Sequence, residues 1–299
     1  SAMLDTLLEI ADQCDGVRCD MAMLLLNDVF AGTWGNAAGA VPATQYWTDL
    51  IPNVRKKHPD FLFMAEAYWN REWDLQQLGF DYCYDKRLYD RLLHDDAQSI
   101  RDHLGADLDY QRKLVRFLEN HDEPRAASTL AENRDEAAAL AVSTLPGAIL
   151  YYQGQFCGAK IKVPVQLGRG PAEPCNAALS EFYARIRDFT AKIKSKGAIW
   201  TLCHADGWPD NATANNLIAW SWENSGSRFL IVINFSGEAS QGRVSVPWTD
   251  LAGASWDLND LWAQQQFVRD GSEIQNQGLY VALDPWKFHV LKFASNTDQ

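Results

Sequence analysis

The stretch ATQYWTDLIPNVRKKHPDFLFMAE, residues 43–66, decides the fold class. Residues 43–58 have the apolar spacing of an amphipathic helix, and residues 60–65 form a short apolar run that is typical of a buried strand. A carboxylate, Glu66, ends that run. A helix that leads into a buried strand is the repeating unit of an α/β protein with a parallel sheet.

The same alternation extends on both sides of this stretch, as far as about residue 195. We expect five strands, at residues 16–19, 60–65, 80–84, 113–118 and 148–152. We expect helices at residues 4–14, 43–58, 86–104, 134–145 and 177–194. The last helix carries an apolar stripe formed by Leu179, Phe182, Ile186 and Phe189, and we expect this stripe to pack against the region that follows.

From about residue 199 the pattern changes to alternating runs, such as residues 216–222 and 228–234, separated by Gly, Ser and Asn turns. This pattern predicts an all-β C-terminal sandwich. We therefore expect two domains, residues 1–196 and 197–299. Eight of the 12 tryptophans lie in the second domain. Several alternate inside strands, which favours packing in the core over a sugar-binding surface.

The chain has 299 residues, with 27 Lys+Arg against 39 Asp+Glu, a net charge of −12. This charge argues against nucleic acid as a partner, and an apolar fraction of 47% argues against disorder. The sequence offers neither a readable signal peptide nor an apolar window of membrane-spanning length, which favours a cytoplasmic location without a membrane partner. The six cysteines include no C-x-x-C pair, so we expect reduced structural thiols and no zinc site. No motif for an organic cofactor is present, and we expect none to bind.

Polar residues at the carboxyl ends of parallel strands are candidates for chemistry, because the loops of a barrel enzyme converge there. Arg18 and Asp20 occupy alternate positions and therefore share one side of an extended strand, where the arginine can hold the aspartate ionised. Glu66 closes the next strand, with Tyr68 and Trp69 just beyond it. A carboxyl group beside aromatic rings tends to have a raised pKa, which suits a general acid.

A third polar group, Asn120, His121 and Asp122, follows the strand predicted at residues 113–118. Taken singly, these patterns have structural explanations: a surface ion pair, a solvated carboxylate and a turn. Together they indicate more, because carboxylates on consecutive parallel strands can approach to about 5 Å, the spacing that a double-displacement glycosidase requires.

These segments resemble the hallmark motifs of the alpha-amylase superfamily, glycoside hydrolase family 13. DGVRCDMA (15–22) resembles the fourth-strand segment, which implies that Asp20 is the nucleophile and Arg18 its partner. FLFMAEAYW (61–69) resembles the fifth-strand segment, which implies that Glu66 is the acid/base. PGAILYYQGQF (146–156) resembles the eighth-strand stretch, and the trailing β-domain resembles the C-terminal sandwich of the family.

FLENHD (117–122) resembles the seventh-strand segment of the family. This resemblance implies that His121 binds a substrate hydroxyl and that Asp122 orients the sugar ring and stabilises the transition state. With Arg18, we include Asn120, Tyr68 and Trp69 among the expected substrate-binding residues. Met23 and Leu24 stand where the family often has Lys-His, so we expect no calcium site.

Only 19 residues precede Asp20, whereas the family barrel has three strands before its fourth-strand motif. We therefore expect an α/β fold that is a partial (β/α)8 TIM-type barrel, from about the fourth strand onward, followed by the β-sandwich. Such a sheet has two open edges and an open apolar face, which would include Val17 and Leu62, and this predicts a homodimer that covers them.

The function that this resemblance implies is a retaining α-glycoside hydrolase or transglycosylase acting on α-glucans or α-glucosides, with an oligo- or polysaccharide as substrate. The alternative is a truncated, catalytically silent remnant that folds, oligomerises and binds sugars.

Overall fold

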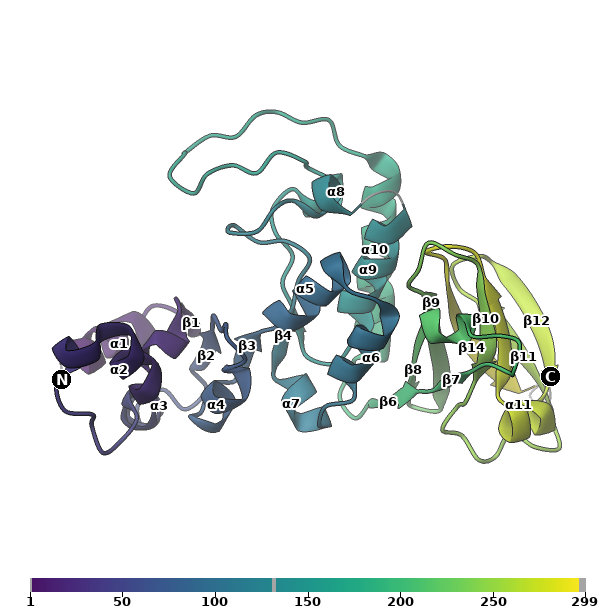
Figure 1. Cartoon of the computed structure of the whole chain (residues 1–299), viewed down its shortest axis with the longest axis horizontal. Coiled ribbons are helices and arrows are strands. Elements are labelled where there is room, and N and C mark those ends of the chain that lie inside the picture. The colour runs from purple at the N-terminus through teal and green to yellow at the C-terminus, as the bar shows by residue number, and fades with distance from the viewer. Residues whose placement is uncertain (1, 131–132, 296–299) are drawn as a thin grey trace. The chain divides into compact units, whose positions relative to one another are not determined.

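The first sheet of the protein is parallel and has five strands in the order β1-β2-β3-β4-β5. The computed structural model describes residues 2–130 and 133–295 (Figure 1). The five strands are β1 (Gly16–Cys19), β2 (Leu62–Ala65), β3 (Tyr82–Tyr84), β4 (Leu114–Arg116) and β5 (Ala148–Ile149). All five expected strands exist and pair in chain order, which confirms the α/β class with a parallel sheet.

Helices connect these strands. They are α1 (Ala2–Ala11), α2 (Asn27–Trp34), α3 (Tyr46–Arg55), α4 (Glu72–Gln77), α5 (Lys86–His94), α6 (Ala97–Leu104), α7 (Leu108–Arg112), α8 (Ala126–Thr129), α9 (Asn133–Thr144) and α10 (Ala177–Ile193). The single helix expected at residues 86–104 is wrong, because the chain breaks it into α5 and α6. Asp96 causes the break: its side chain accepts a hydrogen bond from the backbone N–H of Ser99 at 2.9 Å and starts a new helix.

The strand register assigns each side chain to one face of the parallel sheet. Val17 lies opposite Phe63 in the β1–β2 pair, and both contribute to one buried cluster that also contains residues of α3. Leu62 lies on the other face and is 47% exposed. The expectation that Val17 shares the open face with Leu62 is therefore wrong, because neighbouring positions on a strand point to opposite sides.

The C-terminal region consists of two antiparallel sheets. The six-stranded sheet has the order β12-β11-β14-β9-β8-β6 and the three-stranded sheet the order β13-β10-β7. Their strands are β6 (Ile199–Cys203), β7 (Ala205–Asp206), β8 (Leu217–Asn224), β9 (Ser227–Asn234), β10 (Ser240–Val244), β11 (Ser255–Asp260), β12 (Gln265–Asp270), β13 (Leu279–Leu283) and β14 (Phe288–Ser295). The region is not purely β, because α11 (Gly271–Gln277) begins where the Asp270 carboxylate accepts the backbone N–H of Glu273 at 2.8 Å.

The described chain forms two compact units. The first runs to Tyr89 and also takes in Asp107–Arg116 and Gly147–Ile149, so it holds the whole parallel sheet. The second comprises Asp90–Ala106, Phe117–Pro146 and the chain from Leu150 onward.

Helix α10 packs against the antiparallel sheet inside the second unit. The four side chains of its expected apolar stripe are all buried, which confirms the stripe. Phe189 meets Phe229 of β9 with ring centroids 5.5 Å apart, and Phe182 meets Phe288 of β14 at 6.1 Å. Trp220 and Trp222 of β8 are also buried, in agreement with the expectation that tryptophans fill the core.

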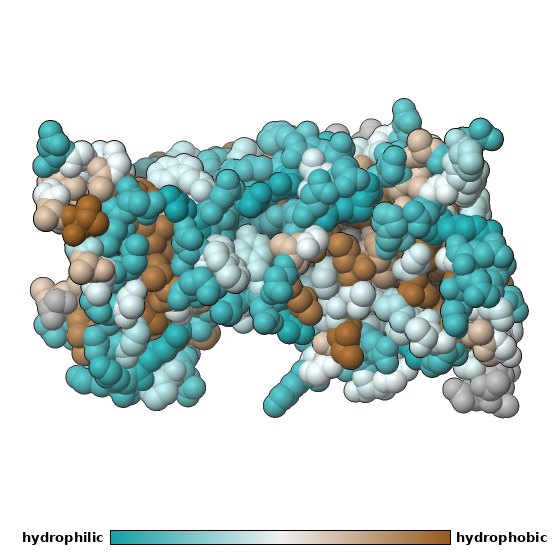
Figure 2. Space-filling view, turned by 60° about the horizontal axis from the view of Figure 1, so that its bottom comes forward, coloured by the Kyte–Doolittle hydropathy of each residue, from teal (hydrophilic) through white to brown (hydrophobic). Residues whose placement is uncertain are grey.

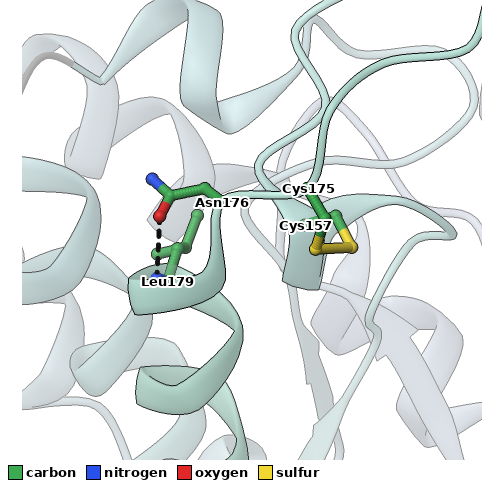
Figure 3. Close-up of a disulfide and its surroundings, with 4 residues drawn as sticks. All are labelled: Cys157, Cys175, Asn176 and Leu179. Atoms are coloured by element: carbon green, nitrogen blue, oxygen red, sulfur yellow. Dashed lines mark hydrogen bonds between the residues drawn. A yellow bond between two sulfur atoms is a disulfide. The ribbon is translucent and has the colours of Figure 1, made fainter.

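The structure contains one disulfide among its described residues, between Cys157 and Cys175 (Figure 3). The expectation of six reduced cysteines is wrong for this pair. The physical reason is tertiary: Cys157 ends the 3₁₀ turn η3 (Gln155–Cys157), and Cys175 directly precedes Asn176, the cap of α10. None of the helices in the described residues has the length and apolar character needed to cross a membrane.

Candidate active site

The candidate catalytic carboxylates of the first unit leave the same end of two neighbouring strands. Cys19 lies opposite Ala65 in the parallel β1–β2 pair, so Asp20 and Glu66 are the next residues along the two chains. Backbone hydrogen bonds fix this exit: the N–H of Glu66 donates to the carbonyl of Cys19 at 3.0 Å. The local pairing therefore delivers two acidic side chains to one place.

One arginine contacts both carboxylates. Nη2 of Arg18 lies 2.8 Å from Oε1 of Glu66, and Nη1 forms an ion pair with Oδ1 of Asp20. Because both nitrogens belong to a single guanidinium group, the two carboxylates lie close together. Burial by itself lowers the pKa of Arg18, but hydrogen bonds with Asp20 and Tyr84 and the charge of Glu66 raise it above its usual value. Arg18 is thus a permanent cation between two acids.

Glu66 is almost completely buried, with an exposed fraction of 3%. Its Oε2 accepts the backbone N–H of Met21 at 2.6 Å, and its Oε1 accepts the hydroxyl of Tyr68 at 3.4 Å. Met21 has a left-handed backbone with φ 43°, which is unusual for a residue with a side chain. This conformation aims the N–H at Glu66, and no pattern in the sequence indicates it.

Asp20 is much more open to solvent than Glu66. Its side chain is 78% exposed, against 4% for the side chain of Glu66. Trp69 is also 61% exposed, and Trp69 and Asn70 both have a left-handed backbone conformation. The structure thus brings together Arg18, Asp20, Glu66 and Tyr68, and presents Trp69 at the surface of the same unit.

The third predicted segment, Asn120, His121 and Asp122, belongs to the second unit. Nε2 of His121 lies 2.9 Å from Oδ2 of Asp122, and both side chains are partly exposed. Asn120 is 2% exposed, and its Oδ1 accepts the backbone N–H groups of Asp122 at 2.8 Å and Glu123 at 2.9 Å. Asn120 therefore shapes the turn that presents its two neighbours.

Sequence reasoning missed a buried ion pair beside this turn. Oε1 of Glu119 lies 2.5 Å from Nη1 of Arg125, and Oε2 accepts the backbone N–H of Ala126 at 2.7 Å. Burial raises the pKa of Glu119, while the Ala126 N–H and Arg125 oppose that rise. Glu119 stands inside the FLENHD segment, but nothing in the sequence marks Arg125 as its partner.

A second contact that the sequence does not indicate reaches the same turn. Nζ of Lys162 donates a hydrogen bond to the main-chain oxygen of Asp122.

Within residues 2–130 and 133–295, no group of three or more His, Cys, Asp or Glu side chains is arranged to hold a metal ion.

Comparison with known proteins adds one curated relative and many solved structures. No family model matches the chain. Alpha-amylase MalA from Haloarcula japonica is 31% identical over 169 residues, which cover 53% of this chain and 22% of that protein. This chain therefore spans less than a quarter of the curated relative.

The solved structures agree over almost all of this chain. A maltogenic alpha-amylase, AmyB, from Thermotoga neapolitana has a TM-score of 0.70 at 16% identity, over 98% of this chain and 66% of its own. The alpha-amylase of Geobacillus thermoleovorans, solved with acarbose, also has a TM-score of 0.70 at 16% identity, over 99% and 64%. At these identities the similarity establishes the fold.

Proposed function

We propose, from the relationship of this chain to the alpha-amylase superfamily, that it acts as a retaining α-glycoside hydrolase or transglycosylase on α-glucans or α-glucosides. The observation that carries the proposal is the guanidinium of Arg18 between Asp20 and Glu66 at the ends of adjacent parallel strands. Oligo- or polysaccharides are the proposed substrates, and the acarbose bound in the Geobacillus alpha-amylase agrees with this class.

In this mechanism Asp20 attacks the anomeric carbon and forms a covalent glycosyl-enzyme intermediate, while Glu66 protonates the leaving oxygen. Glu66 then removes a proton from the incoming water or sugar hydroxyl, which releases the product with retained configuration. Arg18 keeps Asp20 oriented, and His121 and Asp122 bind the sugar ring, with Tyr68 and Trp69 as further contacts.

The parallel sheet is, in this proposal, the second part of a (β/α)8 barrel, with domains at residues 1–196 and 197–299. Two observations support it. The chain matches the amylase structures over 98–99% of its own length, and it spans only 64–66% of theirs. A barrel begun by strands outside this sequence would account for both.

The test of the catalytic roles is turnover of nitrophenyl α-glucosides by the whole chain. Glu66→Gln and Asp20→Asn should each lower kcat by at least about 10²-fold, because each removes a group that acts in the transition state. Asp60→Asn is the matched control, since Asp60 is exposed and precedes β2 at its opposite end. Unchanged turnover in Glu66→Gln would refute its assignment as acid/base.

A second candidate is a sugar-binding protein without turnover. The 78% exposure of the Asp20 side chain favours it, because a nucleophile surrounded by water lacks the dry, preorganised site that catalysis requires. Calorimetric titration with maltooligosaccharides separates the candidates. Binding that Asp20→Asn leaves intact, together with no turnover in the wild type, supports the silent form.

The proposed homodimer covers the open side of the first unit. Its sheet ends at two edge strands, β1 and β5, and Leu62 on β2 is 47% exposed. Figure 2 shows apolar patches separated by polar surface on the face it presents. The chain mass of 33.7 kDa predicts about 67 kDa by light scattering, and Leu62→Asp should return the mass to about 34 kDa. A wild-type mass near 34 kDa at tens of micromolar contradicts the dimer.

A further inference from the structure

Residues 158–174 form a long segment without helix or strand between η3 and α10, which Figure 1 shows as an extended excursion. The disulfide between Cys157 and Cys175 closes its base (Figure 3). Directly after the disulfide, the side chain of Asn176 accepts the backbone N–H of Leu179 at 3.2 Å and caps α10. The base of the segment is therefore anchored to the beginning of a long helix.

Hydrogen bonds join the two arms of the segment next to the disulfide. The carboxylate of Glu173 accepts the backbone N–H groups of Lys160 at 2.8 Å and Ile161 at 3.2 Å. The backbone N–H of Asn176 donates to the carbonyl of Cys157 at 3.0 Å. Because Glu173 lies two residues before Cys175, the disulfide holds this carboxylate opposite its two donors.

Lys162 follows immediately after these bonded positions, and its Nζ reaches the main-chain oxygen of Asp122. The other contacts of Asp122 come from its own turn: its carboxylate pairs with His121, and its N–H donates to Asn120. Lys162 is thus a support for Asp122 from a distant part of the sequence. A lysine side chain is long and flexible, so it supports Asp122 only where its own backbone is held.

We infer that Lys162 is a positioning residue for Asp122 and that the Cys157–Cys175 disulfide keeps it in place, which couples the oxidation state of these cysteines to substrate engagement at Asp122. This inference rests on the proposed function for its effect on turnover. Its structural part, the coupling of the segment to the turn at residues 120–123, depends only on the contacts of Lys162 and Glu173 and on the disulfide.

The switch is an ordinary thiol–disulfide exchange with an external dithiol. The S–S bond breaks, each sulfur gains one hydrogen, and the two thiols of the reductant are oxidised to its own disulfide. The ends of the segment are then no longer tied, so the effective concentration of Glu173 at residues 160–161 falls. The backbone at Lys162 is then no longer held in place, and the side chain loses its contact with Asp122.

Amide hydrogen exchange of the whole chain, followed by mass spectrometry, tests the coupling without any substrate. Dithiothreitol, or the double substitution Cys157→Ser and Cys175→Ser, should speed exchange in residues 158–174 and also at residues 122–123. Lys162→Met should speed exchange at residues 122–123 alone. Lys162→Arg should leave the exchange rate at these residues close to that of the wild type. Cys14→Ser is the control, because Cys14 is an exposed free thiol. Faster exchange in the segment with no change at residues 122–123 would overturn the inference.

Kinetics then separate this inference from the proposed function. In an active wild type, reduction and Lys162→Met should each lower kcat/KM by about 10-fold, mostly through kcat. The reason is that a misplaced Asp122 stabilises the transition state less. Lys162→Arg should recover most of that loss. Turnover that reduction and Lys162→Met leave unchanged overturns the regulatory role while the hydrolase assignment stands. A wild type without turnover defeats the proposed function, and the exchange pattern still decides the coupling.

Discussion

Two arginine–carboxylate pairs at the strand ends of one parallel sheet differ entirely in their access to water. Arg18 and Asp20 at the end of β1 have side chains that are 26% and 78% exposed. Arg116, the last residue of β4, and Asp85, the first residue after β3, are 0% exposed. The two pairs have the same chemistry, and both lie at the carboxyl ends of strands of this sheet.

The difference shows which pair is structural and which is available to a ligand. Asp85 accepts the backbone N–H of Leu88 at 3.1 Å at the start of α5, and Arg116 also donates to Gln111. Burial lowers the pKa of Arg116 to about 9. Arg116 therefore remains charged at neutral pH, and hydrogen bonds to neighbouring groups surround the pair. Of the two aspartates, Asp20 is the one that solvent reaches.

The largest expected effect is on the buried pair. Asp85→Ala leaves the Arg116 guanidinium buried without its carboxylate and should lower the free energy of unfolding by about 3–5 kcal/mol. Urea unfolding followed by circular dichroism measures the loss. Asp60→Ala, at an exposed position in the same unit, should change stability by less than about 0.5 kcal/mol. Equal effects of the two substitutions would show that the Arg116–Asp85 pair contributes nothing.

A third carboxylate, Asp135 on α9, extends the comparison to a buried acid whose Oδ1 has no hydrogen-bond partner. Burial, with the nearby charges of Glu119 and Glu136, raises the pKa of Asp135 to about 7. In the unfolded chain this pKa is about 3.9, so the folded state holds an extra proton between about pH 4 and pH 7. Stability should therefore fall as the pH rises through this window, by about 4 kcal/mol.

Asp135→Asn mimics the protonated acid and should make the protein more stable than the wild type, by about 4 kcal/mol at pH 8 and by only about 1.5 kcal/mol at pH 5. Urea midpoints at the two pH values measure this. Glu181→Gln removes an exposed carboxylate from α10 and should leave the pH dependence unchanged. Other groups can make the wild type more stable at pH 8 than at pH 5, and Asp135→Asn should then make that rise steeper. A rise in the wild type that Asp135→Asn does not make steeper would contradict the assignment.

The smallest expected loss of stability is at the open pair. Arg18→Met should cost about 1–2 kcal/mol, since Arg18 keeps partial contact with water and Glu66 retains its bond from Met21. Under the proposed function, the same substitution should lower kcat by about 10²-fold. Arg116→Met is the matched comparison and should cost more stability. If both variants lost the same stability, exposure would not distinguish the two pairs.

The parallel sheet and the long helix could be predicted because their signals are local. Strand β1 begins and ends where the sequence predicts, and the apolar stripe of α10 needs only helical spacing to be recognised. Helices α4 and α7 escaped prediction because they are six and five residues long, too short for a period to show. Helix α6 is a separate element because the Asp96 side chain caps its beginning, and helical spacing alone does not reveal such a cap.

The candidate site divides in the same way. Its acidic residues and Arg18 follow from their positions at strand ends, which is a property of the sequence. The sequence does not indicate the burial of Glu66 or the left-handed backbone of Met21. It also does not indicate the contact of Lys162 with Asp122. These depend on which loops meet, and a loop carries no periodic signal that tells where it goes.

By itself the sequence determined the order of the five parallel strands, the strand-rich C-terminal region and the acidic strand ends, because hydrophobic spacing acts through near neighbours. Only the tertiary structure decided that Cys157 forms a disulfide with Cys175 and that Arg116 pairs with Asp85. It also decided that the side chain of Asp20 is exposed while that of Glu66 is buried. Each of these is a contact or an exposure set by residues far apart in the chain. The free energy of such a contact depends on burial, which exists only once the elements have packed.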